Sequence, residues 1–89
     1  MIVRTTTICN RLGLHARAAS RLVQTAQGYA AEITITNGDH AANGKSIMAI
    51  MMLQAAVGTE LTLSAEGEDE TEAMMAILTL IEGRFGEDD

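Results

Sequence analysis

Residues 31–42 read AEITITNGDHAA, and apolar and polar residues alternate before the pair Asn37-Gly38. Such alternation is typical of a strand that buries one face. Asn-Gly favours a two-residue type I′ turn, because that turn needs positive φ at both central positions. The segment therefore predicts an antiparallel hairpin, with one strand over residues 31–36 and a short return strand over residues 39–42.

Helices are predicted on both sides of this hairpin. The first covers residues 16–27 and ends before Gly28, with apolar residues at i, i+3, i+4 and i+7 spacing. The second follows Ser46, a favoured N-cap residue, and contains the apolar run IMAIMMLQAAV up to Gly58. Each helix has one apolar face, so each is expected to cover a sheet.

Two outer strands and a last helix complete the predicted elements. Residues 2–8 combine Thr with aliphatic side chains, and residues 59–66 alternate in the same way as the hairpin. Asp69 with Glu72 three positions later resembles a capping box, which predicts a helix from there to Glu82.

The element order β-α-β-β-α-β-α predicts an α+β domain. We expect a four-stranded antiparallel sheet covered on one face by three helices. Aromatic residues are nearly absent, so the core is expected to be aliphatic. The other face of the sheet is expected to be polar and solvated, with Thr5, Thr7, Thr34, Thr36, Thr62 and Ser64 on it.

Length and charge limit the functions that the chain can have. Its 89 residues are enough for one domain. Residues 1–59 carry a net charge of +3 and residues 60–89 one of −9, for −6 overall. This acidity and the lack of stacking aromatics argue against nucleic-acid binding. We interpret the acidic C-terminal part as a solvated helix and tail.

Membrane insertion, secretion and metal binding are not expected. The longest apolar stretch is far shorter than the ~20 residues of a membrane span. The N-terminal MIVRTTTI does not have the form of a signal peptide, and the lone Cys9 fits a reducing cytoplasm. One Cys and two His do not provide a structural zinc site, so we expect no metal and no cofactor.

Residues 10–19, NRLGLHARAA, are the part of the chain most suited to chemistry. His15 lies between a glycine-containing loop and a helix start, where the backbone N–H groups of Ala16 and Arg17 have no intrahelical partner. An anion at His15 would meet these groups and the Arg17 guanidinium, and Arg11, Arg21 and Lys45 are expected to add positive charge. A neutral imidazole beside such a site can accept a phosphoryl group. The alternatives are a surface histidine at the helix start or a metal ligand.

Two separate motifs resemble the signature regions of the HPr family, the histidine-containing phosphocarriers of the phosphoenolpyruvate-dependent phosphotransferase system. They are GLHARAA at 13–19 and GKSIM at 44–48, and LSAEGEDE at 63–70 is similar to a further region of that family. The resemblance covers nearly the whole chain, so it implies one HPr-like domain over residues 1–89. It also implies an open-faced β-sandwich, which agrees with the element order.

The resemblance implies a carrier rather than a turnover enzyme. His15 would be phosphorylated on Nδ1 by phospho-enzyme I and would pass the group to a histidine of an enzyme IIA, with Arg17 steadying the phosphate. The sequence departs from a common form of the motif at Leu12, Ala16 and Ala18, where a polar Asn, a Thr and a Pro are found in other members.

Ser46 and an apolar helix face complete the expected sites. The resemblance implies that an HPr kinase/phosphorylase phosphorylates Ser46 in some bacteria. Flexible Met side chains suit a surface that must fit several partners. The residues expected to dock enzyme I and enzyme IIA are Ser20, Arg21, Ile47, Met48 and Met51.

Three other classes remain as alternatives or are disfavoured. A regulatory binding module of the same fold would bind partners without relaying a phosphoryl group. A nitrogen-related paralogue of the carrier falls between the two. A small metal or redox domain is disfavoured by the missing Cys-x-x-Cys motif. A transiently docking protein of this size is expected to be a monomer.

Overall fold

The computed structural model describes residues 1–88 and has the predicted element order. The strands are β1 (Ile2–Thr7), β2 (Glu32–Asn37), β3 (His40–Asn43) and β4 (Glu60–Glu66), and the helices are α1 (Ala16–Gln27), α2 (Ile47–Met52), α3 (Glu70–Glu82) and the 3₁₀ turn η1 (Arg84–Gly86). The predicted α+β class, with one open antiparallel sheet and helices on one face, is confirmed.

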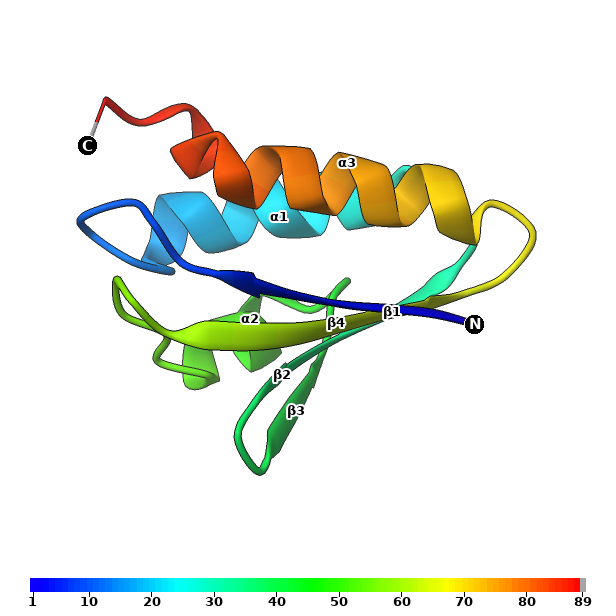
Figure 1. Cartoon of the computed structure of the whole chain (residues 1–89), viewed down its shortest axis with the longest axis horizontal. Helices are drawn as coiled ribbons and strands as arrows, with labels where there is room; N and C mark the ends of the chain where they lie inside the picture. Colours follow the sequence, from blue (N-terminus) through cyan, green and yellow to red (C-terminus); the bar gives the residue numbers. More distant parts are fainter. Residues whose placement is uncertain (89) are drawn as a thin grey trace.

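The four strands form one antiparallel sheet in the order β1-β4-β2-β3. β4 lies between β1 and β2, so the first and the last strands of the chain are neighbours. This arrangement leaves β1 and β3 as the edges. The loop after β1 and the loop after α2 lie at the same end of the molecule as the C-terminal segment (Figure 1).

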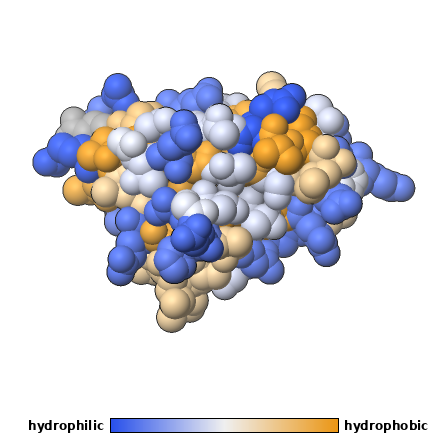
Figure 2. Space-filling model, turned by 60° about the horizontal axis from the view of Figure 1, so that its bottom comes forward, coloured by the Kyte–Doolittle hydropathy of each residue, from blue (hydrophilic) through white to orange (hydrophobic). Residues whose placement is uncertain are grey.

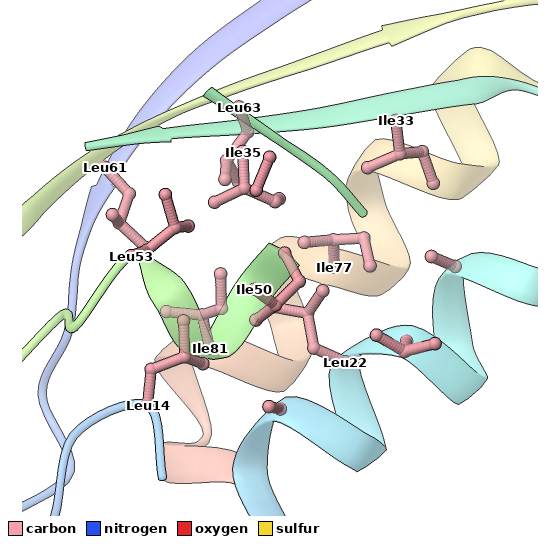
Figure 3. Close-up of a cluster of buried hydrophobic side chains, with 14 of the residues drawn as sticks. Leu14, Leu22, Ile33, Ile35, Ile50, Leu53, Leu61, Leu63, Ile77 and Ile81 are labelled. Atoms are coloured by element: carbon pink, nitrogen blue, oxygen red, sulfur yellow. The ribbon is translucent and has the colours of Figure 1, made fainter. Parts of the chain in front are cut away.

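One face of the sheet is covered by helices. α1 and α3 lie side by side over it (Figure 1), and α2 packs against α1 and β3. Figure 3 shows side chains from all three helices and from the sheet pointing into one aliphatic cluster. Its labelled members are Leu14, Leu22, Ile33, Ile35, Ile50, Leu53, Leu61, Leu63, Ile77 and Ile81, all of them buried.

The opposite face of the sheet is polar. Figure 2 brings this face forward, and residues of intermediate hydropathy occupy its middle. Cross-strand pairing aligns Thr5 with Thr62 and Thr62 with Thr36, and aligns Ser64 with Thr34. The expected solvated threonine face is therefore present, because period-2 alternation places these side chains opposite the buried Ile and Leu.

Helix α2 is shorter than predicted. The apolar run up to residue 57 suggested a helix ending at Gly58, but α2 ends at Met52. Gln54 has a φ of +52°, which no helix can continue through, and the chain then forms a loop. Burial of Leu53 and Ala55 in the core, rather than helix periodicity, explains the apolar composition of this loop.

Two local predictions about turns and caps are wrong. Asn37 is the last residue of β2 and pairs with His40, so the two turn residues are Gly38 and Asp39; only Gly38 has a positive φ, of +60°. The type I′ turn centred on Asn37-Gly38 therefore does not form. Asp69 makes no side-chain cap at α3. Its carboxylate instead accepts hydrogen bonds of 2.8 Å from the N–H groups of Ala30 and Ala31.

The C-terminal segment is folded rather than solvated. After α3 the chain turns through η1, where Arg84 and Phe85 have φ values of +59° and +54°. The Phe85 side chain is 0% exposed, so the core is not purely aliphatic. The Arg21 guanidinium of α1 donates to the Phe85 carbonyl, which fixes this turn beside the N-terminal half of the chain.

Candidate functional site

His15 stands at the N-terminal end of α1. It is the N-cap residue, with extended backbone angles and no side-chain cap hydrogen bond, and its carbonyl accepts the first helical bond from Ala19 N–H at 2.8 Å. The loop before it is held by a 2.8 Å hydrogen bond from Leu14 N–H to the carbonyl of Ala55. The His15 side chain is 29% exposed, so the imidazole is fixed in place yet accessible.

The backbone donors expected beside His15 are available. Among residues 1–88, the N–H groups of Ala16 and Arg17 have no hydrogen-bond acceptor. Both residues are exposed, and the Arg17 side chain makes no hydrogen bond within the same part of the chain. Together with the positive end of the α1 dipole, these groups can bind an anion placed next to His15.

Three other cations were expected near His15, and Arg11 is exposed in the loop before it. The other two are placed differently from each other. Arg21 lies one turn further along α1, is half-buried, and is committed to the Phe85 carbonyl. Lys45 was expected to add charge near His15, but its Nζ donates a 2.7 Å hydrogen bond to the carbonyl of Tyr29, beyond the C-terminal end of α1. That expectation is wrong, because Lys45 lies at the opposite end of the helix.

Glu87 is the site residue that the sequence did not indicate. Its Oε2 contacts Nε2 of His15, and its Oε1 accepts a 3.0 Å hydrogen bond from Nδ2 of Asn10. The same Asn10 Nδ2 donates to the carbonyl of Gly13 at 2.7 Å. Glu87 is 72 residues from His15 in the sequence, so no local pattern could have paired them.

The environment of Glu87 favours its ionised form. The hydrogen bond from Asn10, followed by the contact with His15, lowers the pKa of the Glu87 carboxyl below its ordinary value, and the nearby Arg21 charge acts in the same direction. Partial burial opposes this shift without reversing it. A carboxylate is therefore held at Nε2, while no group among residues 1–88 hydrogen-bonds to Nδ1 of His15.

Helix α2 provides an exposed apolar surface next to α1. Met48 and Met52 are 72% and 75% exposed, and Ile47 and Met51 are also exposed. We call these four residues the α2 surface. Met52 was not among the predicted docking residues, because about half of this apolar face was expected to pack against the sheet. Ser20, on α1, is half-buried.

Ser46 is the N-cap of α2, as predicted. Its Oγ accepts a 3.3 Å hydrogen bond from the N–H of Ala49, and the residue is half-buried. Ser46 thus has a structural role in starting α2, and the hydroxyl lies at the edge of the α2 surface.

Cys9 is exposed, and its Sγ lies 3.4 Å from the carbonyl of Ile81.

Neither a metal cluster nor a membrane-spanning helix is found in the described chain. Residues 1–88 contain no group of three or more His, Cys, Asp or Glu side chains positioned to hold a metal ion. Within the same residues, every helix is too short or too polar to cross a bilayer.

Comparison with known proteins gives consistent matches over the whole chain. The family model described as PTS HPr component phosphorylation site matches residues 2–83. Phosphocarrier protein HPr of Neisseria meningitidis is 49% identical over 87 residues, which is 98% of each chain. Phosphocarrier protein NPr of Shewanella violacea is 43% identical over 94% of this chain and 92% of its own. The crystal structure of HPr-C-His from Thermoanaerobacter tengcongensis matches with a TM-score of 0.96 and 45% identity, covering both chains completely.

Proposed function

This chain belongs to the HPr family of phosphocarrier proteins of the phosphotransferase system, and we propose that it carries the phosphoryl group on His15. The resemblance seen in its two sequence motifs is thereby confirmed. Proteins of this family are carriers rather than turnover enzymes. We further propose that residues 1–89 act as one domain, which receives the group from phospho-enzyme I and delivers it to a histidine of an enzyme IIA.

One observation carries this proposal: an accessible imidazole stands at a helix N-terminus whose first N–H groups have no acceptor among residues 1–88. A phosphoryl group on Nδ1 of His15 would meet the N–H groups of Ala16 and Arg17, and the Arg17 guanidinium would donate further hydrogen bonds. In-line phosphoryl transfer depends mainly on positioning and charge stabilisation, which this arrangement supplies.

We assign docking of both partners to the α2 surface together with Ser20 and Arg21. The helix lies against α1, so a partner seated on its Met side chains is beside His15. Flexible Met side chains can fit two different surfaces, and a carrier must bind both a donor and an acceptor. Arg21 is half-buried, and its guanidinium keeps its positive charge while it donates to the Phe85 carbonyl, so it can attract an acidic partner.

We also propose that phosphorylation of Ser46 by an HPr kinase/phosphorylase regulates docking. A phosphate on Oγ would be favourable at the helix N-terminus but would place two negative charges at the edge of the α2 surface. An acidic partner would then approach more slowly. Ser46→Asp is expected to lower the association rate with enzyme I at low salt, and an unchanged rate there would exclude this electrostatic effect.

A nitrogen-related carrier is the second candidate, favoured by the 43% identity to the NPr protein of Shewanella violacea. The two functions differ in the acceptor and not in the chemistry at His15. Incubating the phosphorylated protein with a sugar-specific and with a nitrogen-related enzyme IIA, and following the loss of phosphate from each reaction, separates them. A purely regulatory module would transfer the group to neither.

The proposed function is tested by intact mass after incubation with phosphoenolpyruvate and enzyme I. We expect the gain of one phosphoryl group that brief acid treatment removes, as is characteristic of phosphohistidine. His15→Ala should abolish the gain while leaving the fold intact, because the side chain is partly exposed and its polar partner is the Glu87 carboxylate at the end of α1. No gain with the unmodified protein, under conditions in which a control carrier is phosphorylated, would reject the proposal.

A further inference from the structure

We propose that Glu87 is a positioning residue for phosphoryl acceptance: it holds the proton of His15 on Nε2 and thereby leaves the lone pair on Nδ1 for the incoming phosphorus. The inference rests on the proposed function and adds a residue to it. Glu87 lies beyond residue 83, where the family match ends.

The argument begins with the chemistry of the contact between Glu87 and His15. An ionised carboxylate can only accept hydrogen bonds, so Nε2 must be the donor in its contact with Oε2. In a neutral imidazole the other nitrogen, Nδ1, then carries the lone pair. The hydrogen bond made by one ring nitrogen commonly decides which tautomer a functional histidine adopts.

Asn10 fixes the orientation of the Glu87 carboxylate. The Asn10 amide is fully buried, and its Nδ2 lies between two acceptors, Glu87 Oε1 at 3.0 Å and the carbonyl of Gly13 at 2.7 Å. Only the NH₂ end of the amide can satisfy both. Oε1 is therefore committed to Asn10, and Oε2 is left to face His15.

Buried neighbours hold the segment that carries Glu87. Phe85 is inserted in the core two residues earlier, and its carbonyl accepts from the Arg21 guanidinium. The lowered pKa of Glu87 keeps the carboxylate ionised at neutral pH. The groups facing it are Asn10, His15 and Arg21, and none of them is an acid.

The transfer step balances without loss of a proton from His15. The lone pair of Nδ1 forms the new bond to phosphorus as the bond from phosphorus to the donor histidine nitrogen breaks, and the electron pair of that bond returns to the donor. The imidazole ring gains positive charge while Nε2 keeps its proton. The Glu87 carboxylate stabilises this charge from the side opposite the phosphoryl group.

Glu87→Gln tests the inference sharply because Asn10 decides how the new amide is oriented. The Gln carbonyl oxygen must face Asn10 Nδ2, which turns its NH₂ toward Nε2 of His15. That nitrogen must then accept, so the proton moves to Nδ1 and the lone pair needed for acceptance is lost. In a catalytic triad the corresponding change from Asp to Asn causes the same reversal of tautomer. Asp88→Asn is the matched control, since it removes the same charge from an exposed neighbour.

The experiment combines imidazole ¹⁵N NMR of His15 with the rate of phosphorylation by phospho-enzyme I. We expect the unmodified protein and Asp88→Asn to carry the proton on Nε2. Glu87→Gln should carry it on Nδ1 and accept the phosphoryl group at least about 10- to 100-fold more slowly, the range found when the partner that orients a metal-ligating histidine is lost. Glu87→Ala, which holds neither nitrogen, should give a mixture of tautomers and an intermediate rate.

The two readouts separate failure of this inference from failure of the proposed function. NMR needs no donor protein, so a protein that shows the expected tautomers but accepts no phosphate would reject the proposed function, and with it any role of Glu87 in acceptance. A protein that accepts phosphate at the same rate with and without the Glu87 carboxylate, or whose tautomer is unchanged in Glu87→Gln, would overturn the positioning role alone.

Discussion

Arg21 of α1 and Phe85 of η1 are joined by a hydrogen bond from the guanidinium to the main-chain carbonyl, across 64 residues of sequence. The bond satisfies a carbonyl in a turn with positive φ, and it holds that turn against the helix whose N-cap is His15. Removing it should therefore affect both stability and the geometry of Glu87.

We expect Arg21→Ala to lower the free energy of unfolding by about 1.5–3 kcal/mol, the usual contribution of a hydrogen bond that involves a charged group. Urea denaturation measures the change. Arg17→Ala is the matched control, because it removes the same side chain from the same helix where no hydrogen bond is made within residues 1–88. Equal losses in the two variants would show that the bond to Phe85 is not the cause.

Alanine variants of Gly13 and Gly38 can be compared to separate the cost of backbone strain from the cost of steric overlap. Both have positive φ, +68° and +60°, but a Cβ at Gly13 would lie 2.7 Å from the carbonyl oxygen of Ala55, whereas one at Gly38 would meet nothing within 4 Å. We expect Gly38→Ala to cost about 1 kcal/mol from the left-handed conformation alone.

Gly13→Ala should cost about 2–4 kcal/mol, because steric overlap adds about 1–3 kcal/mol to the same strain. It should also move the loop that carries His15. Chemical denaturation of both variants gives the comparison, and the ¹⁵N resonances of His15 should shift only in Gly13→Ala. A Gly13 variant as stable as the Gly38 variant would contradict the close approach to Ala55.

The hydrogen bonds to the Asp69 carboxylate are expected to make the stability of the fold depend on pH in the acidic range. The hydrogen bond from Ala30 N–H, with a second from Ala31 N–H, holds the pKa of the Asp69 carboxyl below its ordinary value. A group whose pKa is lowered by folding stabilises the protein fully above its unfolded pKa, about 3.9 for aspartate, and this is lost as the pH falls through the folded pKa. Unfolding midpoints in urea should therefore fall on acidification.

Asp69→Asn should make that fall shallower, because the charged acceptor is gone at every pH. Asp39→Asn, in the exposed hairpin turn and without a hydrogen bond within residues 1–88, serves as the control. If the two variants lose stability in parallel between about pH 6 and about pH 3, the hydrogen bonds to Ala30 and Ala31 do not account for acid sensitivity.

The cap formed by Ser46 can be tested apart from any regulation. Ser46→Ala removes the oxygen that accepts from Ala49 N–H and should destabilise the protein by about 1 kcal/mol. Ser20→Ala makes the same replacement inside α1, where Ala is the better helix former, and should leave stability equal or slightly higher. Thermal unfolding of the two variants distinguishes a loss of the cap from a general effect of Ser to Ala.

Much of the fold follows from local patterns, and the exceptions share a cause. The bounds of α1 agree with the predicted residues 16–27, because its apolar spacing and Gly28 are both local signals. The end of α2 was misjudged because Leu53 and Ala55 are apolar for contact with distant strands and loops. The Asp69 cap was wrong because its carboxylate finds better donors in the loop after α1.

The candidate site shows the same limit. His15, Ala16 and Arg17 could be predicted because a helix start supplies donors to whatever histidine precedes it. Glu87 could not, since its role depends on a turn in which Arg84 and Phe85, neither of them Gly, take positive φ. An acidic C-terminal sequence suggests solvation, whereas the burial of Phe85 and the hydrogen bond from Arg21 bring that sequence back to the start of α1.

The contact between His15 and Glu87 has a consequence for synthesis of the chain. A ribosome produces Glu87 72 residues after His15, so the imidazole is made well before the carboxylate that contacts it. Synthesis of α1 alone therefore does not supply the acceptor for Nε2 of His15. Synthesis of Glu87, rather than of the helix, is therefore the step after which Nε2 of His15 can contact this carboxylate.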